Sequence, residues 1–167
     1  MGYNISMDLA FILDFISEAA YFIGVFLIFM VIVVAKGRQA IINVIFSLYL
    51  ALLISLVFPY YDTLLDTFDT AKGVASGKLI IFALFTMTFF LLANRIMPDE
   101  FKEKKFESFG KKVLLALAAT SLVMVFSFQV LPITEFLTPG TPIQSLFSPE
   151  NYFFWWLLAP LVILFIL

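Results

Sequence analysis

Cysteine and histidine are both absent from this chain of 167 residues. Without cysteine no disulfide or thiolate nucleophile can form, and without histidine there is no imidazole to act as a general base. Haem, zinc and iron–sulfur sites also lose their usual protein ligands. The sequence shows no phosphate-binding loop and no nucleophile–base motif either. We therefore expect no cofactor and no enzymatic activity.

Charged residues are scarce as well, at 13% of the chain, whereas hydrophobic residues make up 63%. A soluble domain has about 25% charged residues. The run from Ala19 to Ala35 contains no charge at all, and at about 1.5 Å per residue it covers most of a ~30 Å hydrocarbon core. Its large apolar side chains favour membrane insertion by about 3–7 kcal/mol in total. The main partner of the chain is therefore predicted to be the lipid bilayer, and no nucleic acid is expected.

The predicted fold is all-α: a polytopic integral membrane protein with about five transmembrane helices in one membrane domain. Gly37 is suited to the turn after the first span, while Pro59 and Pro132 end the second and the fourth. The fifth span begins at Pro149, with the Ser148 hydroxyl as a helix cap. The spans are predicted at about residues 9–35, 40–58, 79–94, 113–131 and 149–167.

The basic residues indicate the orientation of these spans. Eight of the ten fall between spans one and two or between spans three and four, and only Lys72 and Lys78 fall on the opposite side. Because positively charged loops stay in the cytoplasm, we expect the N-terminus outside and the C-terminus inside. The predicted location is a cell membrane, specifically a prokaryotic inner membrane. The eight basic residues on the predicted cytoplasmic side are Lys36, Arg38, Arg95, Lys102, Lys104, Lys105, Lys111 and Lys112.

Two loops have charged and apolar residues in a helical pattern, which predicts short amphipathic helices in the headgroup plane. The first covers residues 62–72, where Asp62, Asp66 and Asp69 would share one face. The second covers residues 98–110, where phenylalanines alternate with lysines and glutamates. The aspartate face could in principle offer oxygen ligands to a divalent cation, but carboxylates on a straight helix cannot wrap around one ion. A hydrated surface is the favoured interpretation.

Asp14 and Glu18 are four residues apart and therefore share one face of the first helix. If both were buried, the pair could hold an ion or share a proton, because desolvation and like-charge repulsion favour protonation. The simpler interpretation places both carboxylates, ionised and hydrated, in the outer headgroup layer. The buried pair is the basis of our alternative function, a small oligomeric transporter or ion channel.

Ala116 and Thr120 form a small-xxx-small pair in the fourth span. Small residues let helices approach closely in lipid, so this pair is either a self-association interface or an intramolecular packing site. Intramolecular packing is the favoured interpretation. Asn43 and Gln129 also lie within predicted spans, and their amides require hydrogen-bond partners. We expect both to make buried polar contacts with protein.

The order of these features resembles the colicin V production protein family of bacterial inner-membrane proteins. The matching pieces are the Lys36-Gly37-Arg38 turn, the Pro59-Tyr60-Tyr61 end of the second span, and the basic segment FKEKKFESFGKKV before the fourth span. The resemblance implies an accessory role in export or envelope processes and supplies no catalytic residues. Our leading hypothesis is accordingly a non-enzymatic accessory or scaffold protein, which would act with other membrane proteins or by self-association.

Overall fold

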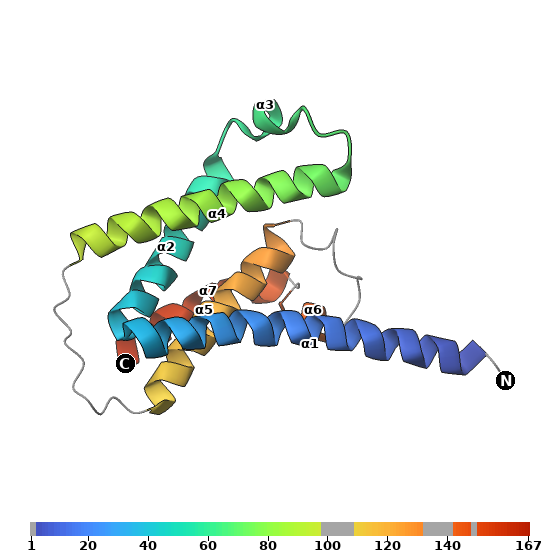
Figure 1. Ribbon diagram of the computed structural model, residues 1–167, viewed down its shortest axis with the longest axis horizontal. Helices are drawn as coiled ribbons and strands as arrows, with labels where there is room; N and C mark the ends of the chain where they lie inside the picture. The colour runs from blue at the N-terminus through green and yellow to red at the C-terminus, as the bar shows by residue number, and fades with distance from the viewer. Residues whose placement is uncertain (1–2, 98–108, 132–141, 148–149) are drawn as a thin grey trace.

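The computed structural model describes residues 3–97, 109–131, 142–147 and 150–167, and every regular element in these ranges is a helix. Figure 1 shows long helices that cross one another and are joined by turns and short helices. The helices are α1 (Tyr3–Lys36), α2 (Arg38–Val57), α3 (Tyr61–Leu65), α4 (Ala71–Ile96), α5 (Phe109–Gln129), α6 (Pro142–Phe147) and α7 (Glu150–Ile166).

Four of the described helices are long and apolar enough to cross a membrane: α1, over Ala19–Lys36, and α2, α4 and α5. The chain is therefore an all-α polytopic membrane protein. The fifth predicted span corresponds to α7, which has 17 residues and a length of about 26 Å. This helix packs against α5 and the short α6 (Figure 1).

The surface helix predicted over residues 62–72 is wrong in its extent. The structure has only the short α3, and α4 already begins at Ala71 rather than at residue 79. Thr70 explains the break, because its backbone is extended and its Oγ1 accepts a hydrogen bond from the Gly73 backbone N–H at 3.1 Å. Such a cap starts a new helix, so Asp62 and Asp69 do not lie on one helical face. Of the second predicted surface helix, residues 98–108 lie outside the described part of the chain.

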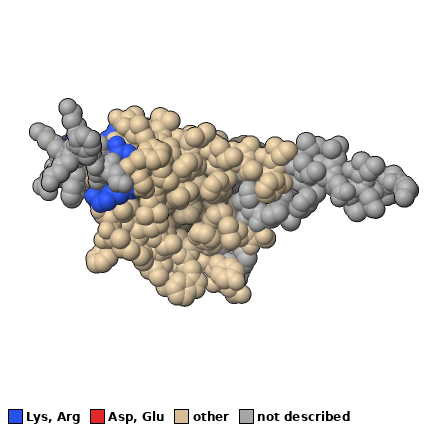
Figure 2. All heavy atoms as spheres, turned by 90° about the horizontal axis from the view of Figure 1, so that it is seen from below, with Lys and Arg blue, Asp and Glu red and all other residues tan. Residues whose placement is uncertain are grey.

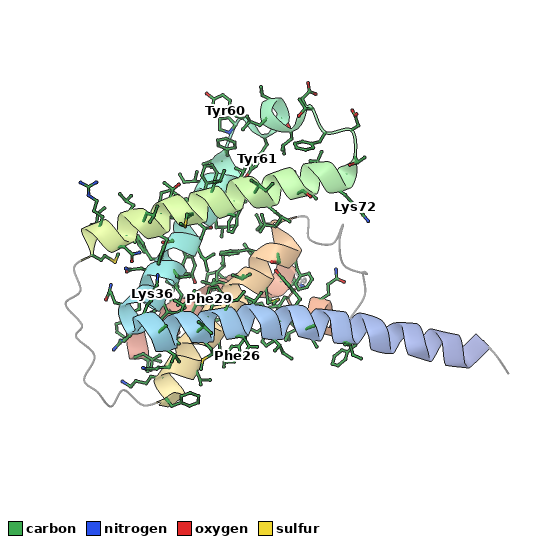
Figure 3. The ribbon with its side chains drawn as sticks, in the orientation of Figure 1. Phe26, Phe29, Lys36, Tyr60, Tyr61 and Lys72 are labelled. Carbon is green, nitrogen blue, oxygen red and sulfur yellow. The ribbon has the colours of Figure 1, made fainter. Side chains whose placement is uncertain are left out.

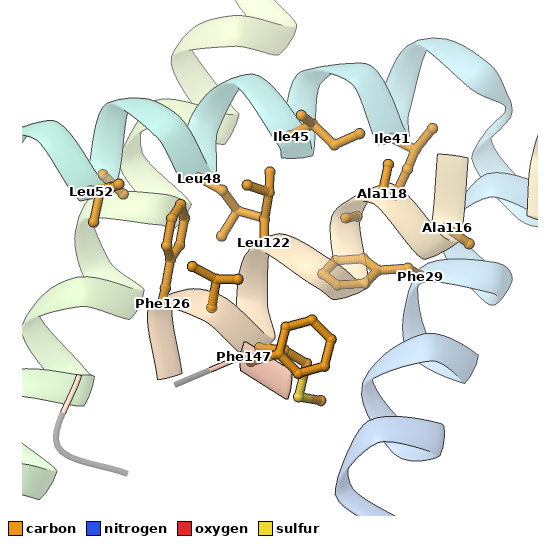
Figure 4. Close-up of a cluster of buried hydrophobic side chains, with 14 of the residues drawn as sticks. Phe29, Ile41, Ile45, Leu48, Leu52, Ala116, Ala118, Leu122, Phe126 and Phe147 are labelled. Atoms are coloured by element: carbon orange, nitrogen blue, oxygen red, sulfur yellow. The ribbon is translucent and has the colours of Figure 1, made fainter. Parts of the chain in front are cut away.

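Helix α5 forms the centre of the bundle and packs against α1, α2 and α7. Figure 4 shows how its side chains meet those of the neighbouring helices. Small residues let the helices approach, and Ala116 and Ala119 are fully buried. Leu122 and Phe126 of α5 belong to the same buried cluster as Leu48 of α2. The largest side chains of the described part with almost no exposed surface are Phe126, Ile41, Ile45, Leu115, Leu122, Met124, Val33 and Val125.

The outer surface of the bundle is apolar rather than charged. Val31, Leu56, Leu84, Leu91 and Phe154 are each more than half exposed, and they come from four different helices. A water-soluble monomer rarely exposes apolar patches of this extent, whereas in a bilayer the same side chains face acyl chains. The exposed surface therefore agrees with a lipid-embedded body.

Basic residues of the described part gather at one end of this body. Lys36 and Arg38 flank the α1–α2 turn, Arg95 ends α4, and Lys111 and Lys112 begin α5. Figure 2 shows blue side chains at this end and no red ones on the same face of the described body. Lys36 and Lys72 lie at opposite ends of the molecule (Figure 3). We refer to the end that carries Lys36, Arg38, Arg95, Lys111 and Lys112 as the basic end.

Candidate functional site

The turn between α1 and α2 positions the residues of the basic end. Gly37 has φ 86° and ψ −179°, a backbone conformation that is essentially restricted to glycine. Its N–H donates to the Val33 carbonyl at 3.1 Å, which closes the last turn of α1. The chain turns at this single residue, so Lys36 ends α1 and Arg38 begins α2.

Hydrogen-bonded side-chain amides connect α2 to α4 at the basic end. Asn43, which is only 2% exposed, donates from Nδ2 to Asn94 Oδ1 at 2.6 Å. Its own Oδ1 accepts from Gln39 Nε2 at 3.0 Å, and its backbone carbonyl accepts from Ser47 Oγ at 2.5 Å. Asn43 therefore lies inside the protein with its amide bonded on both sides.

A groove with a volume of about 410 Å³ lies between α1, α2 and α4. Helix α2 packs on both of the other helices, whereas α1 and α4 have no comparable contact with each other, so a space is left between them. The Thr86 hydroxyl in this groove donates a hydrogen bond to the Phe82 carbonyl at 2.9 Å. Lys36 is the charged residue of the lining. The groove is lined by Ile32, Lys36, Val44, Leu48, Phe82, Ala83, Thr86, Met87 and Phe90.

A second apolar groove, of about 420 Å³, lies between α1, α5, α6 and α7. Its polar groups are bonded to backbone carbonyls, since Ser121 Oγ donates to Ala118 O at 2.9 Å and Trp156 Nε1 donates to Leu146 O at 3.0 Å.

A smaller and more polar pocket lies beside α3, where the Lys78 ammonium is 5.8 Å from the centre of the Tyr61 ring. Within the described residues no group of carboxylates could hold a metal ion.

Tyrosine hydroxyls form contacts between helices that were not predicted from the sequence. Tyr21 OH and Ser127 Oγ are 2.8 Å apart and join α1 to α5. Tyr49 OH donates to the Leu157 carbonyl and joins α2 to α7. A tyrosine in the middle of an apolar span could have indicated such a bond, because its hydroxyl needs a partner in the interior.

The structure buries Ala116 and Thr120 completely, and Thr120 Oγ1 donates to the Ala116 carbonyl at 2.7 Å. Both residues therefore pack within one chain and offer no surface to a second copy. Asp14 and Glu18 belong to α1, and Gln129 is the last residue of α5. The side chains of these three residues lie outside the described part, so their predicted roles stay predictions.

No family model, curated protein or solved structure matches this chain. The resemblance to colicin V production proteins is therefore still a prediction based on the sequence.

Proposed function

We propose that this chain is a non-enzymatic accessory or scaffold protein of a cell membrane, with its basic end in the cytoplasm. The proposal is supported by the hydrogen bonds that the polar side chains make. Several hydroxyl groups of the described spans bond to carbonyls of their own helices, and the Tyr21 hydroxyl and the Asn43 amide join one helix to another. These bonds hold the bundle together and leave the grooves apolar.

A scaffold acts through its outer surface, so contacts with other membrane proteins would lie along the exposed faces of α1, α4 and α7. Interfaces between helices in lipid depend on shape and close packing, since hydrophobic side chains there already face an apolar solvent. The predicted prokaryotic inner membrane and the colicin V production-like role in export or envelope processes are part of the same proposal.

The experiment is a photo-crosslinking scan in living cells. A photoreactive amino acid replaces Val31, Leu91 or Phe154, which are exposed on three different helices, or the buried Leu122 as a control. The proposal predicts a reproducible product with the same membrane protein from one exposed face and none from Leu122. It also predicts that the assembly containing this partner is depleted when the chain is deleted. A chain that gives no product from any face, and that turns over a substrate as a purified protein, would contradict the proposal.

A further inference from the structure

The groove between α1, α2 and α4 combines an apolar interior with a cation at one end. Ile32 and Lys36 are one helical turn apart on α1, so the lysine stem continues the apolar wall while its ammonium extends towards the basic end. Lys36 is exposed and lies at the end of the helix. Phe82 and Phe90 on α4 form the opposite wall.

We propose that this groove binds an anionic phospholipid, whose acyl chain lies along the apolar interior and whose phosphate contacts Lys36. The volume of about 410 Å³ is comparable to that of one acyl chain. The headgroup would lie at the basic end, where Arg38 begins α2 and Arg95 lies in the last turn of α4. Basic pockets between transmembrane helices are suited to anionic headgroups, and one basic residue near such a surface changes affinity about fivefold.

The walls of the groove favour a lipid chain over a partner helix. Helix interfaces in membranes are rich in small residues, whereas Phe82, Met87 and Phe90 in the lining of this groove are large. The Asn43–Asn94 hydrogen bond holds α2 and α4 together one helical turn beyond Phe90, near the charged end of the groove. The site depends on the membrane fold alone and is independent of the proposed accessory role.

The test measures lipid binding to the purified full-length chain by native mass spectrometry. Phosphatidylglycerol and phosphatidylcholine with identical acyl chains are titrated separately into the detergent-solubilised protein. The variants are Lys36→Gln and Lys36→Arg, with Lys72→Gln as a matched control at the opposite end of the molecule (Figure 3). We expect wild-type protein to bind phosphatidylglycerol several-fold more tightly than phosphatidylcholine. Lys36→Gln should weaken phosphatidylglycerol binding about fivefold and phosphatidylcholine binding less, because the choline cation offsets the charge of its phosphate, whereas Lys36→Arg and Lys72→Gln should behave as wild type.

A second pair of variants tests whether the acyl chain lies in this groove. Ala83→Trp would fill the groove, whereas Leu84→Trp places the same aromatic side chain at an exposed neighbour that does not line it. Ala83→Trp should weaken the binding of both lipids, and Leu84→Trp should weaken neither. Equal affinity of the wild type for the two lipids, equal losses in Lys36→Gln and Lys72→Gln, or unchanged binding in Ala83→Trp would each overturn the proposal.

Discussion

Single polar residues determine how these apolar helices fit together. The amide of Asn43 could be predicted to face protein, because an amide in hydrocarbon requires a partner. Its partner Asn94 could not be predicted, since the two residues are far apart in the sequence and Asn94 was the last residue of the predicted third span. The tyrosine bonds of Tyr21 and Tyr49 were missed for the same reason: the sequence shows the need for a partner but does not identify it.

A double-mutant cycle of Asn43→Ala and Asn94→Ala measures the contact between α2 and α4. Side-chain hydrogen bonds between helices in a membrane have coupling energies of about 0.6 kcal/mol on average, with a maximum of about 1.7. Because Asn43 is almost fully buried, we expect a value in the upper half of that range. The free energy of unfolding is measured in mixed micelles for the wild type, both single variants and the double variant. A coupling energy near zero would show that the two amides do not stabilise the bundle together.

Among the described residues, Gly37 is the glycine with a positive φ, so replacing it should strain the backbone. Gly37→Ala should destabilise the protein by about 1–3 kcal/mol, because an alanine at φ 86° and ψ −179° is strained. Gly24→Ala is the matched control, since Gly24 lies within α1 and an added Cβ there would meet nothing within 4 Å. The control should be neutral or stabilise by about 0.5–1 kcal/mol. Equal effects of the two substitutions on thermal unfolding would count against the observed turn.

At the scale of elements, the sequence predicted the helices well and some of their ends poorly. Uncharged runs and the prolines placed α2 and α5 within a few residues of their observed bounds. The start of α4 was missed because the charge pattern of residues 62–72 indicated a separate surface helix, whereas the cap by Thr70 begins α4 at Ala71. A close contact supports this arrangement: a Cβ on Gly77 would lie 2.3 Å from Leu65 Cδ2, so glycine makes room for α3.

Because α5 lies at the centre of the bundle, enlarging one of its small buried residues should destabilise the fold. Ala116→Leu should destabilise the monomer by about 1–3 kcal/mol, because the site is fully buried and tightly packed. Ala35→Leu, on the exposed surface of α1, should have little effect. Thermal unfolding and the molecular mass in detergent are measured for both variants. A changed oligomeric state with unchanged stability would instead support self-association through Ala116 and Thr120.

At the scale of the whole molecule, the membrane class followed from composition, but the arrangement of the helices did not. Several spans are uniformly apolar, so the sequence could not show that α5 is central or that α1 and α4 leave a groove between them. The gathering of basic residues at one end was easier to anticipate, because alternating spans bring alternating loops to the same side. Figure 2 shows this gathering for the described residues.

The proposed accessory role predicts that the chain alone carries no ions. Liposomes containing the purified protein should show the same proton and cation flux as empty liposomes at every pH tested. The double variant Asp14→Asn/Glu18→Gln should not differ from them. A flux that depends on pH and disappears in the double variant would favour the alternative function, since a buried carboxylate pair would then carry the ion.

The central claim, a membrane-embedded bundle with its basic end in the cytoplasm, is tested most directly by labelling single cysteines. The natural chain has no cysteine, so each introduced thiol is the only target for a membrane-impermeant maleimide. Asp62→Cys and Asp69→Cys, between α2 and α4, should react in intact cells. Arg95→Cys and Lys111→Cys, at the basic end, should react only after the membrane is permeabilised. The reverse pattern, or equal labelling of all four positions in intact cells, would contradict the account.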